Sequence, residues 1–169
     1  MQTDYKVIDV MTNKPVTAGK DITLKEAAQI MLDSNVNSLL VVESEKPIGI
    51  ITDEDLVRKV IAKGLDPKKI RVKDIMATDL ITISPGKDIY DAMKVMRDHN
   101  IRQLPVVEKG KLVGFLTAKD ILKIQPELFD LWIEKYELRE EQRKLSENTT
   151  EQEDIFSEFF RKIGIKKKK

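Results

Sequence analysis

The hydrophobic and polar positions of this chain follow a pattern that occurs twice. Each time, apolar residues at helical spacing precede two short apolar runs, and a second helical stretch follows. The helices are predicted at 24–34 and about 53–63 in the first half, and at 89–99 and 118–124 in the second. The runs between them are rich in valine, which is typical of buried strands. Each half therefore predicts the order β-α-β-β-α, and the fold class is α/β, or α+β.

The strands and turns follow from the same pattern. The strands, each half beginning with a short extended piece, are predicted at 15–18, 38–44 and 47–52, and again at 80–83, 103–109 and 112–117. Turns are predicted at 45–47 and 109–110, where polar residues separate two apolar runs. Thr23 and Glu26 have the spacing of a capping box and predict where the first helix begins.

The two halves are copies of one another in sequence. When the chain is shifted by 65 positions, residues 7–56 lie on residues 72–121 without a gap. Identical residues recur throughout, among them Asp9 and Asp74, Met11 and Met76, Thr17 and Thr82, Ala27 and Ala92, and Met31 and Met96. This self-similarity indicates a tandem duplication. Because one copy has little apolar surface to bury, we expect the two copies to pack together as a pair.

The duplication divides the chain into three predicted parts. The first domain covers 1–65, the second covers 66–125, and a C-terminal helical extension with a lysine-rich end covers 126–169. The polar, proline-containing stretch 64–71 is predicted to link the two domains. The extension predicts a long amphipathic helix from 128 to 145 and a shorter, phenylalanine-rich one after 150. We expect the phenylalanine face to pack on the repeats or on a second copy of the chain, and docking of another protein is the alternative.

Composition excludes several classes of function. The 169 residues are 41% hydrophobic and 35% charged, and 30 basic residues nearly balance 29 acidic ones. Neither nucleic acid nor a membrane is therefore expected as the main partner. The chain has no cysteine, which excludes disulfides and thiolate chemistry, and its single histidine, His99, is expected to lie near a helix end. With no secretion signal and no apolar run of membrane-spanning length, a cytoplasmic location is predicted.

Each half ends its last strand with the pattern Gly-x-x-Thr-x-x-Asp, at 49–55 and 114–120. The threonine and the aspartate have the spacing of a helix cap, and caps form with or without a ligand. The same groups also suit a ribonucleotide: the aspartate accepts ribose hydroxyls and the helix start favours phosphate. The glycine, which lacks a Cβ, is expected to let a flat base or a sugar approach the strand. Both interpretations remain open on these residues alone.

The duplicated unit closely resembles the cystathionine-β-synthase (CBS) domain, which occurs in tandem pairs called Bateman modules. The resemblance covers about 7–125 and rests on the order of elements, the Val-x-Asp-Ile/Val-Met opening and the Gly-x-x-Thr-x-x-Asp pattern. It implies a stand-alone pair of archaeal type that forms a homodimer and binds AMP, ADP, ATP or S-adenosylmethionine as a regulatory ligand, with no cofactor required. It also implies a non-enzymatic regulatory, energy-sensing module that passes a conformational change to a partner. A ligand-independent assembly protein, acting through its dimer surface and C-terminal helices, is the alternative.

The resemblance also implies two sets of nucleotide-binding residues. The first set is Val16, Thr17, Asn37, Ser38, Ile51, Thr52 and Asp55. The second set is Ile81, Thr82, Arg102, Leu104, Pro105, Leu116, Thr117, Lys119 and Asp120. Arg102 replaces Asn37, and Lys119 replaces Glu54, so the second site is predicted to prefer phosphorylated ligands, although a solvated surface role for Arg102 is the alternative.

No catalytic site is expected. The sequence contains no Ser-His-Asp pattern, P-loop, Gly-x-Gly-x-x-Gly motif or cluster of metal ligands.

Overall fold

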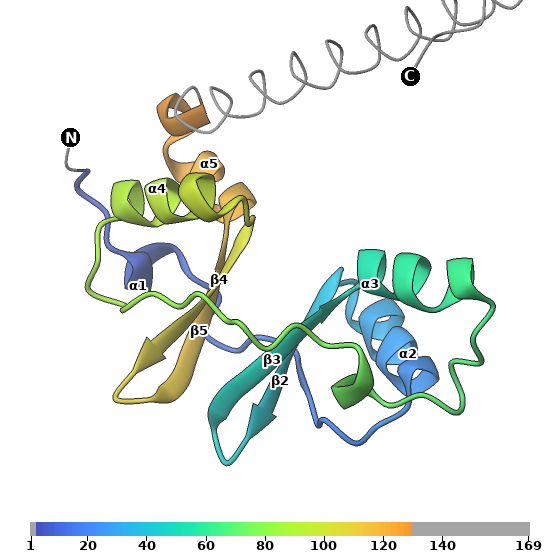
Figure 1. The fold of residues 1–169 in the computed structure, drawn as a ribbon. Helices are drawn as coiled ribbons and strands as arrows, with labels where there is room; N and C mark the ends of the chain where they lie inside the picture. The colour runs from blue at the N-terminus through green and yellow to red at the C-terminus, as the bar shows by residue number, and fades with distance from the viewer. Residues whose placement is uncertain (1–2, 130–169) are drawn as a thin grey trace, which may run out of the picture. The chain divides into compact units, whose positions relative to one another are not determined.

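The computed structural model of the chain describes residues 3–129, in which each sequence half forms a β-hairpin with two helices beside it (Figure 1). The first half contains α1 (Val7–Val10), β1 (Thr17–Ala18), α2 (Leu24–Ser34), β2 (Ser38–Glu43), β3 (Lys46–Thr52), α3 (Asp53–Lys59) and the 3₁₀ turn η1 (Ile61–Lys63). The second half contains η2 (Val72–Asp74), α4 (Ile89–His99), β4 (Gln103–Glu108), β5 (Lys111–Thr117), α5 (Ala118–Ile124) and η3 (Pro126–Leu128). The predicted mixed α/β fold is confirmed. The predicted C-terminal helices lie outside the described residues.

The two hairpins have the same register. Strand β2 pairs antiparallel with β3, β4 pairs antiparallel with β5, and both hairpins shift register at the same place, after Val41 and after Val106. Strand β1 runs parallel to β2 and completes a three-stranded sheet. Its counterpart in the second half makes only an isolated bridge from Ile83 to Val106, so the predicted extended piece 80–83 is not a full strand.

Local sequence signals set the ends of the longest helices. The capping box of Thr23 and Glu26 opens α2, as predicted. Helices α2 and α4 both end at an asparagine in the left-handed region, Asn35 with φ 52° and Asn100 with φ 55°. Asparagine tolerates this conformation better than most residues, which is why both helices stop there.

Three further sequence predictions need correction. The helix predicted at 53–63 ends at Lys59, because Val60 leaves the helical conformation and a 3₁₀ turn follows. The first hairpin turns at Ser44 and Glu45, both with positive φ, instead of at 45–47. The stretch 64–71 is more than a linker, since the carbonyl of Ile70 accepts a hydrogen bond of 2.9 Å from the Leu24 amide at the start of α2.

The two halves exchange their opening segments, 7–12 and 72–77. The Thr12 and Phe115 main chains exchange hydrogen bonds of 2.8 and 3.0 Å, so the first opening segment pairs with β5. In the same way, the Ile50 and Ala77 main chains exchange two hydrogen bonds of 2.9 Å, which pairs the second opening segment with β3. Each half therefore supplies a piece of the other's packing.

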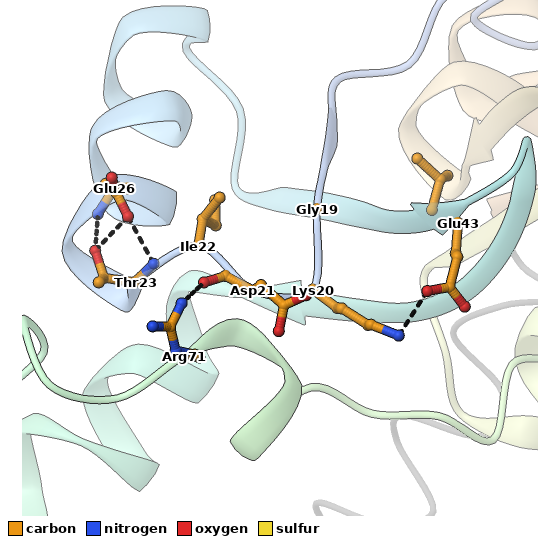
Figure 2. Close-up of a pocket in the computed structure, with 9 residues that line it drawn as sticks. Gly19, Lys20, Asp21, Ile22, Thr23, Glu26, Glu43 and Arg71 are labelled. Carbon is orange, nitrogen blue, oxygen red and sulfur yellow. Dashed lines mark hydrogen bonds and ion pairs between the residues drawn. The ribbon is translucent and has the colours of Figure 1, made fainter.

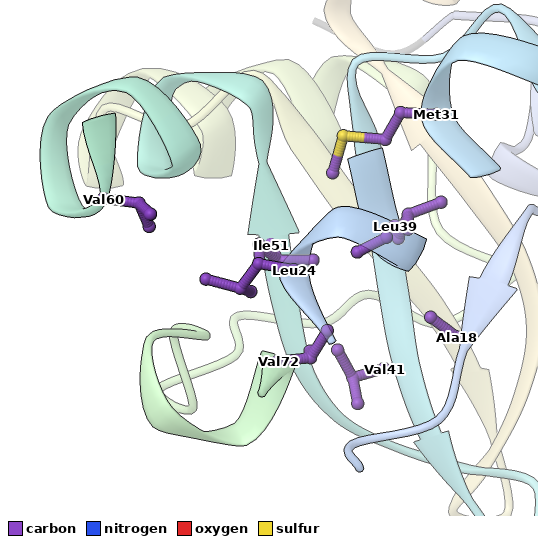
Figure 3. Packing of buried hydrophobic residues seen from close by; sticks show 9 residues of the cluster. Ala18, Leu24, Met31, Leu39, Val41, Ile51, Val60 and Val72 are labelled. Carbon is purple, nitrogen blue, oxygen red and sulfur yellow. The ribbon is translucent and has the colours of Figure 1, made fainter. Parts of the chain in front are cut away.

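The buried cluster of the first half shows the consequence of this exchange. Figure 3 shows Val72, from the second opening segment, beside Leu24 and Val41. All three side chains are completely buried. The cluster contains Ala18, Leu24, Ala27, Met31, Leu39, Val41, Ile51, Val60 and Val72. Burial of these apolar side chains is the main force holding the opening segment in place.

No helix in the part of the chain from residue 3 to residue 129 is long and apolar enough to cross a membrane.

Asp88 fastens the N-terminal segment to α4. Its carboxylate caps the helix by accepting the Tyr90 amide at 2.9 Å, and it also accepts the amide and the hydroxyl of Thr3 at 2.9 and 2.8 Å. Burial by itself would raise the pKa of Asp88, but the hydrogen bonds from Tyr90 and Thr3 hold it below its ordinary value. In the first half the equivalent cap is Thr23, whose side chain bonds, among the described residues, only to Glu26, one turn away.

We predict that Asp88→Ala lowers the free energy of unfolding by about 2 kcal/mol at neutral pH, because a cap and a long-range anchor are lost together. Thr23→Ala, which loses the local cap alone, should cost about 1 kcal/mol. Because the folded pKa of Asp88 is lowered, its contribution is complete above the ordinary carboxyl pKa of about 4 and is lost as the pH falls through the folded value. Urea titrations of both variants from neutral to acid pH measure these effects. An Asp88→Ala difference that does not shrink in acid would contradict this role.

Candidate functional site

The two Thr-x-x-Asp segments are complete helix caps. At the start of α3, the amide and hydroxyl of Thr52 donate to Asp55 Oδ2 at 3.0 and 2.9 Å, and the Asp55 amide donates back to Thr52 Oγ1 at 3.2 Å. At the start of α5, Thr117 and Asp120 make the same three bonds at 3.1, 2.6 and 3.2 Å. The cap interpretation of the repeated pattern is therefore confirmed. It uses only one oxygen of each carboxylate, so it leaves the ligand interpretation open.

The other oxygen distinguishes the two aspartates. Asp55 Oδ1 forms an ion pair of 2.8 Å with Nζ of Lys59, which lies one helical turn later. Burial would raise the pKa of Asp55, but the Lys59 ammonium and the Thr52 donors lower it below its usual value. Lys59 is replaced by Ile124 in the second half, and Asp120 Oδ1 has no hydrogen-bond partner among residues 3–129. Asp120 is therefore the more available acceptor.

Main-chain bonds place residues 37 and 102 beside these helix starts. The Asp53 amide donates to the Asn37 carbonyl at 3.0 Å, and the Ala118 amide donates to the Arg102 carbonyl at 2.9 Å. The Asn37 side chain also bonds Asp53 Oδ2 at 2.7 Å. Arg102 is thus brought to the start of α5, as the sequence interpretation requires for a residue that acts with Asp120.

The charges around the two helix starts differ in sign. The first turn of α3 carries Asp53, Glu54 and Asp55, whereas that of α5 carries only Asp120. Lys119, exposed, takes the position of Glu54, and Arg102 takes that of Asn37. An anionic ligand would therefore meet attraction at α5 and repulsion at α3.

The hairpin register brings several other predicted site residues near these caps. Ser38 is the cross-strand partner of Thr52, and Leu104 is the partner of Leu116. The Val16 carbonyl accepts the Leu40 amide at 3.3 Å, which aligns 16–17 with β2. In the second half, Ile81 and Thr82 precede Ile83, whose amide donates to the carbonyl of Pro105 at 3.1 Å. Two of these predicted residues, Thr17 and Thr82, are exposed.

Some predicted site residues are enclosed in the core. The side chains of Ile51, Leu104 and Leu116 have no exposed surface. They pack against other apolar side chains, so contact with a base would require the packing around them to change.

The glycines of the repeated pattern serve the exchange of opening segments. A Cβ on Gly49 would lie 2.6 Å from Met76 Sδ and 3.0 Å from the Ala77 carbonyl oxygen. A Cβ on Gly114 would lie 2.3 Å from Met11 Sδ. The expectation that these glycines admit a base or a sugar is wrong, because a methionine from the exchanged segment occupies that space.

A surface hollow of about 570 Å³ has none of the predicted site residues in its lining. It is lined by Gly19, Lys20, Asp21, Ile22, Thr23, Glu26, Val42, Glu43 and Arg71. Figure 2 shows bonds among the lining residues: Lys20 pairs with Glu43 at 2.5 Å, Glu26 accepts from Thr23, and Arg71 donates to the main-chain carbonyl of Asp21. Because each of its charged side chains already has a partner in the protein, the hollow gives no sign of the ligand it would take. Within residues 3–129, no group of His, Cys, Asp or Glu side chains could hold a metal ion.

Both sequence halves match the family model of the CBS domain, at residues 7–62 and 72–127. The chain belongs to the CBS domain family. The resemblance inferred from the repeated pattern is confirmed, and the two halves are a CBS pair. CBS pairs are in general regulatory modules and not catalysts, so this chain carries a regulatory module.

Known proteins share this pair. An uncharacterized protein of Methanopyrus kandleri, MK0525, is 38% identical over 122 residues, which cover 71% of this chain and 60% of that protein. The CBS pair of protein MJ0100, solved in complex with 5′-methylthioadenosine and S-adenosyl-L-methionine, is 31% identical with a TM-score of 0.65, covering 71% of this chain and 94% of that one. The hexameric CBS-CP12 protein from bloom-forming cyanobacteria is 28% identical with a TM-score of 0.66, covering 90% and 92%.

Sequence reasoning did not identify three residues that contact the site residues or their glycines: Lys59, Met11 and Met76. The spacing of Asp55 and Lys59, four residues apart on a helix, was a readable sign of an ion pair. The contacts of Met11 and Met76 had no such sign, because their partners lie in the other repeat.

Proposed function

We propose that this CBS pair is a non-enzymatic sensor that binds an adenosine-containing ligand and passes a conformational change to a partner. The candidate ligands are AMP, ADP, ATP and S-adenosylmethionine. The observation that supports the proposal best is Asp120, whose Oδ2 is held by the α5 cap while its Oδ1 has no partner within the part of the chain that the structure describes. A carboxylate fixed in this way is suited to accept the hydroxyls of a ribose. The adenosine compounds bound by MJ0100 support the same class of ligand.

The second repeat is proposed as the phosphate-preferring site. Its exposed positive side chains, Arg102 and Lys119, stand where the first repeat has Asn37 and Glu54. Arginine binds phosphate through paired hydrogen bonds as well as charge. The full proposed set of ligand residues is the one given above, with the buried Ile51, Leu104 and Leu116 contributing only if the core around them rearranges.

The partner and the assembly are also proposals. A homodimer is proposed, and the hexamer formed by CBS-CP12 supports self-association in this family. The C-terminal extension 126–169 is proposed to report the ligand state to a partner, with domains at 1–65 and 66–125 as the sensing part. Such a signal requires the ligand to bind two conformations with different affinity.

Calorimetric titration of the full chain with the four candidate ligands tests the proposal. Saturable binding of at least one is expected. If no ligand gives a binding heat or shifts the melting temperature, the ligand-independent assembly role is the function that remains. That alternative is favoured by the fact that both caps are complete without a ligand.

We predict that Arg102→Ala weakens AMP binding about tenfold and leaves adenosine binding unchanged, because one charge-assisted contact to phosphate is lost. Asn37→Ala, at the equivalent position of the first repeat, is the matched control and should not change the ratio of the two affinities. Equal losses for AMP and adenosine in Arg102→Ala would contradict a phosphate role.

A further inference from the structure

Lys59 bridges the predicted ribose acceptor of the first repeat and the exchanged segment. Its ammonium lies 2.8 Å from Asp55 Oδ1 and 3.0 Å from the carbonyl oxygen of Ile75. The Asp55 side chain is 18% exposed, so this ion pair is partly shielded from water. Ile75 lies two residues before Ala77, which pairs with β3. The bridge therefore joins helix α3 to the start of the second repeat.

The bridge occupies acceptor capacity that a ribose would need. A carboxylate offers about four lone-pair positions. In Asp55, Thr52 uses two of them and Lys59 a third. In Asp120, Thr117 uses two and residues 3–129 use no more. The two hydroxyls of a ribose diol can therefore both bond Asp120, whereas at Asp55 they must displace Lys59.

Displacement of Lys59 can break two interactions of its ammonium. The ammonium loses its ion pair with Asp55 and, if it moves away, its hydrogen bond to Ile75 as well. At the equivalent place in the second repeat, Ile124 carries no charge and cannot compete for Asp120. In the first repeat a lysine therefore competes with the ribose hydroxyls for the aspartate, and in the second repeat no residue at this position does.

We infer that Lys59 is a built-in competitor of the ligand at the first repeat, and that it makes the ribose site of the first repeat weaker than that of the second. The inference rests on the proposed function and adds a residue that sets the ligand preference of one repeat. It also links the ribose acceptor of that repeat to the exchanged segment, because the same ammonium bonds both Asp55 and the carbonyl oxygen of Ile75.

Single-site variants of the full chain test the inference. In an Asp120→Ala background the first repeat is the remaining ribose site, and in an Asp55→Ala background the second one is. Lys59→Ile is then added to the former and Ile124→Lys to the latter, so each repeat receives the residue of the other. Adenosine is the probe, because it carries the diol and no phosphate, and 2′,3′-dideoxyadenosine is the control ligand without the diol.

Lys59→Ile is expected to raise adenosine affinity about tenfold, and Ile124→Lys to lower it by a similar factor, because one ion pair is removed or added. The affinity for dideoxyadenosine should not change in either, which a merely structural effect of the lysine would not produce. Adenosine binding to the parent chain with no response to either substitution overturns the inference and leaves the proposed function standing. Absence of binding of any adenosine ligand to the parent chain overturns both.

Discussion

Asp120→Ala is expected to lower the affinity for AMP about 100-fold, because two ribose hydroxyls lose a charged acceptor. The effect should exceed that of Asp55→Ala, since Asp55 is already bonded to Lys59. Calorimetric titration of wild type and both variants measures the three affinities.

The substitution also removes a helix cap, so a matched control is needed. Glu26 belongs to the capping box of α2 and to neither proposed site. Glu26→Ala should therefore bind AMP as the wild type does. Asp120→Ala with wild-type affinity, or Glu26→Ala with the same loss as Asp120→Ala, would contradict a ribose role for Asp120.

Gly49→Val is expected to lower the free energy of unfolding by roughly 2–3 kcal/mol, through overpacking against the exchanged segment. The first added carbon would lie 3.0 Å from the Ala77 carbonyl oxygen, which cannot move away without disturbing its hydrogen bond to Ile50. The side chain of Met76 can turn aside more easily, so the main-chain contact decides the cost. Urea unfolding measures the difference.

Gly19→Val is the control for this substitution. Gly19 adjoins β1 and has nothing within 4 Å of the position that a Cβ would take. It should be nearly neutral, since no neighbouring atom has to move to admit the valine. Equal stability of Gly49→Val and Gly19→Val would show that the packing of Met76 on β3 contributes little to holding the repeats together.

Much of the fold could be predicted from the sequence because its signals are local. The helices at 24–34, 89–99 and 118–124 have the predicted bounds, and the caps at Thr23, Thr52 and Thr117 form as their spacing indicated. These features depend on residues three or four positions apart. The helix predicted at 53–63 failed at Val60, where apolar residues continue although the helical conformation ends.

The exchange of opening segments could not be predicted in this way. The repeat aligns Met11 with Met76, and nothing in that alignment tells which half each methionine contacts. The two halves are similar enough that packing within a half and between halves would bury similar residues. The position of Gly114 opposite Met11 therefore had to come from the three-dimensional arrangement.

The caps and the charges of the candidate site could be predicted from the sequence. Which of its apolar residues a ligand could reach could not. Arg102 and Asp120 are at the same helix start, as their alignment with Asn37 and Asp55 suggested. The burial of Ile51 and Leu116 was not predicted. The sequence pattern of an apolar strand residue is the same whether its side chain lines a site or lies in the core. The sequence therefore predicts the polar groups of the site, but does not distinguish its apolar walls from the core.

A crystal structure of the protein grown with AMP would show whether Asp120 holds a ribose. We predict a ribose whose hydroxyls lie about 2.6–3.2 Å from Asp120 Oδ1, a hydrogen-bonding distance, with the phosphate near Arg102. AMP bound elsewhere, or a crystal in which Asp120 remains a helix cap with no ligand beside it at saturating AMP, would contradict this prediction.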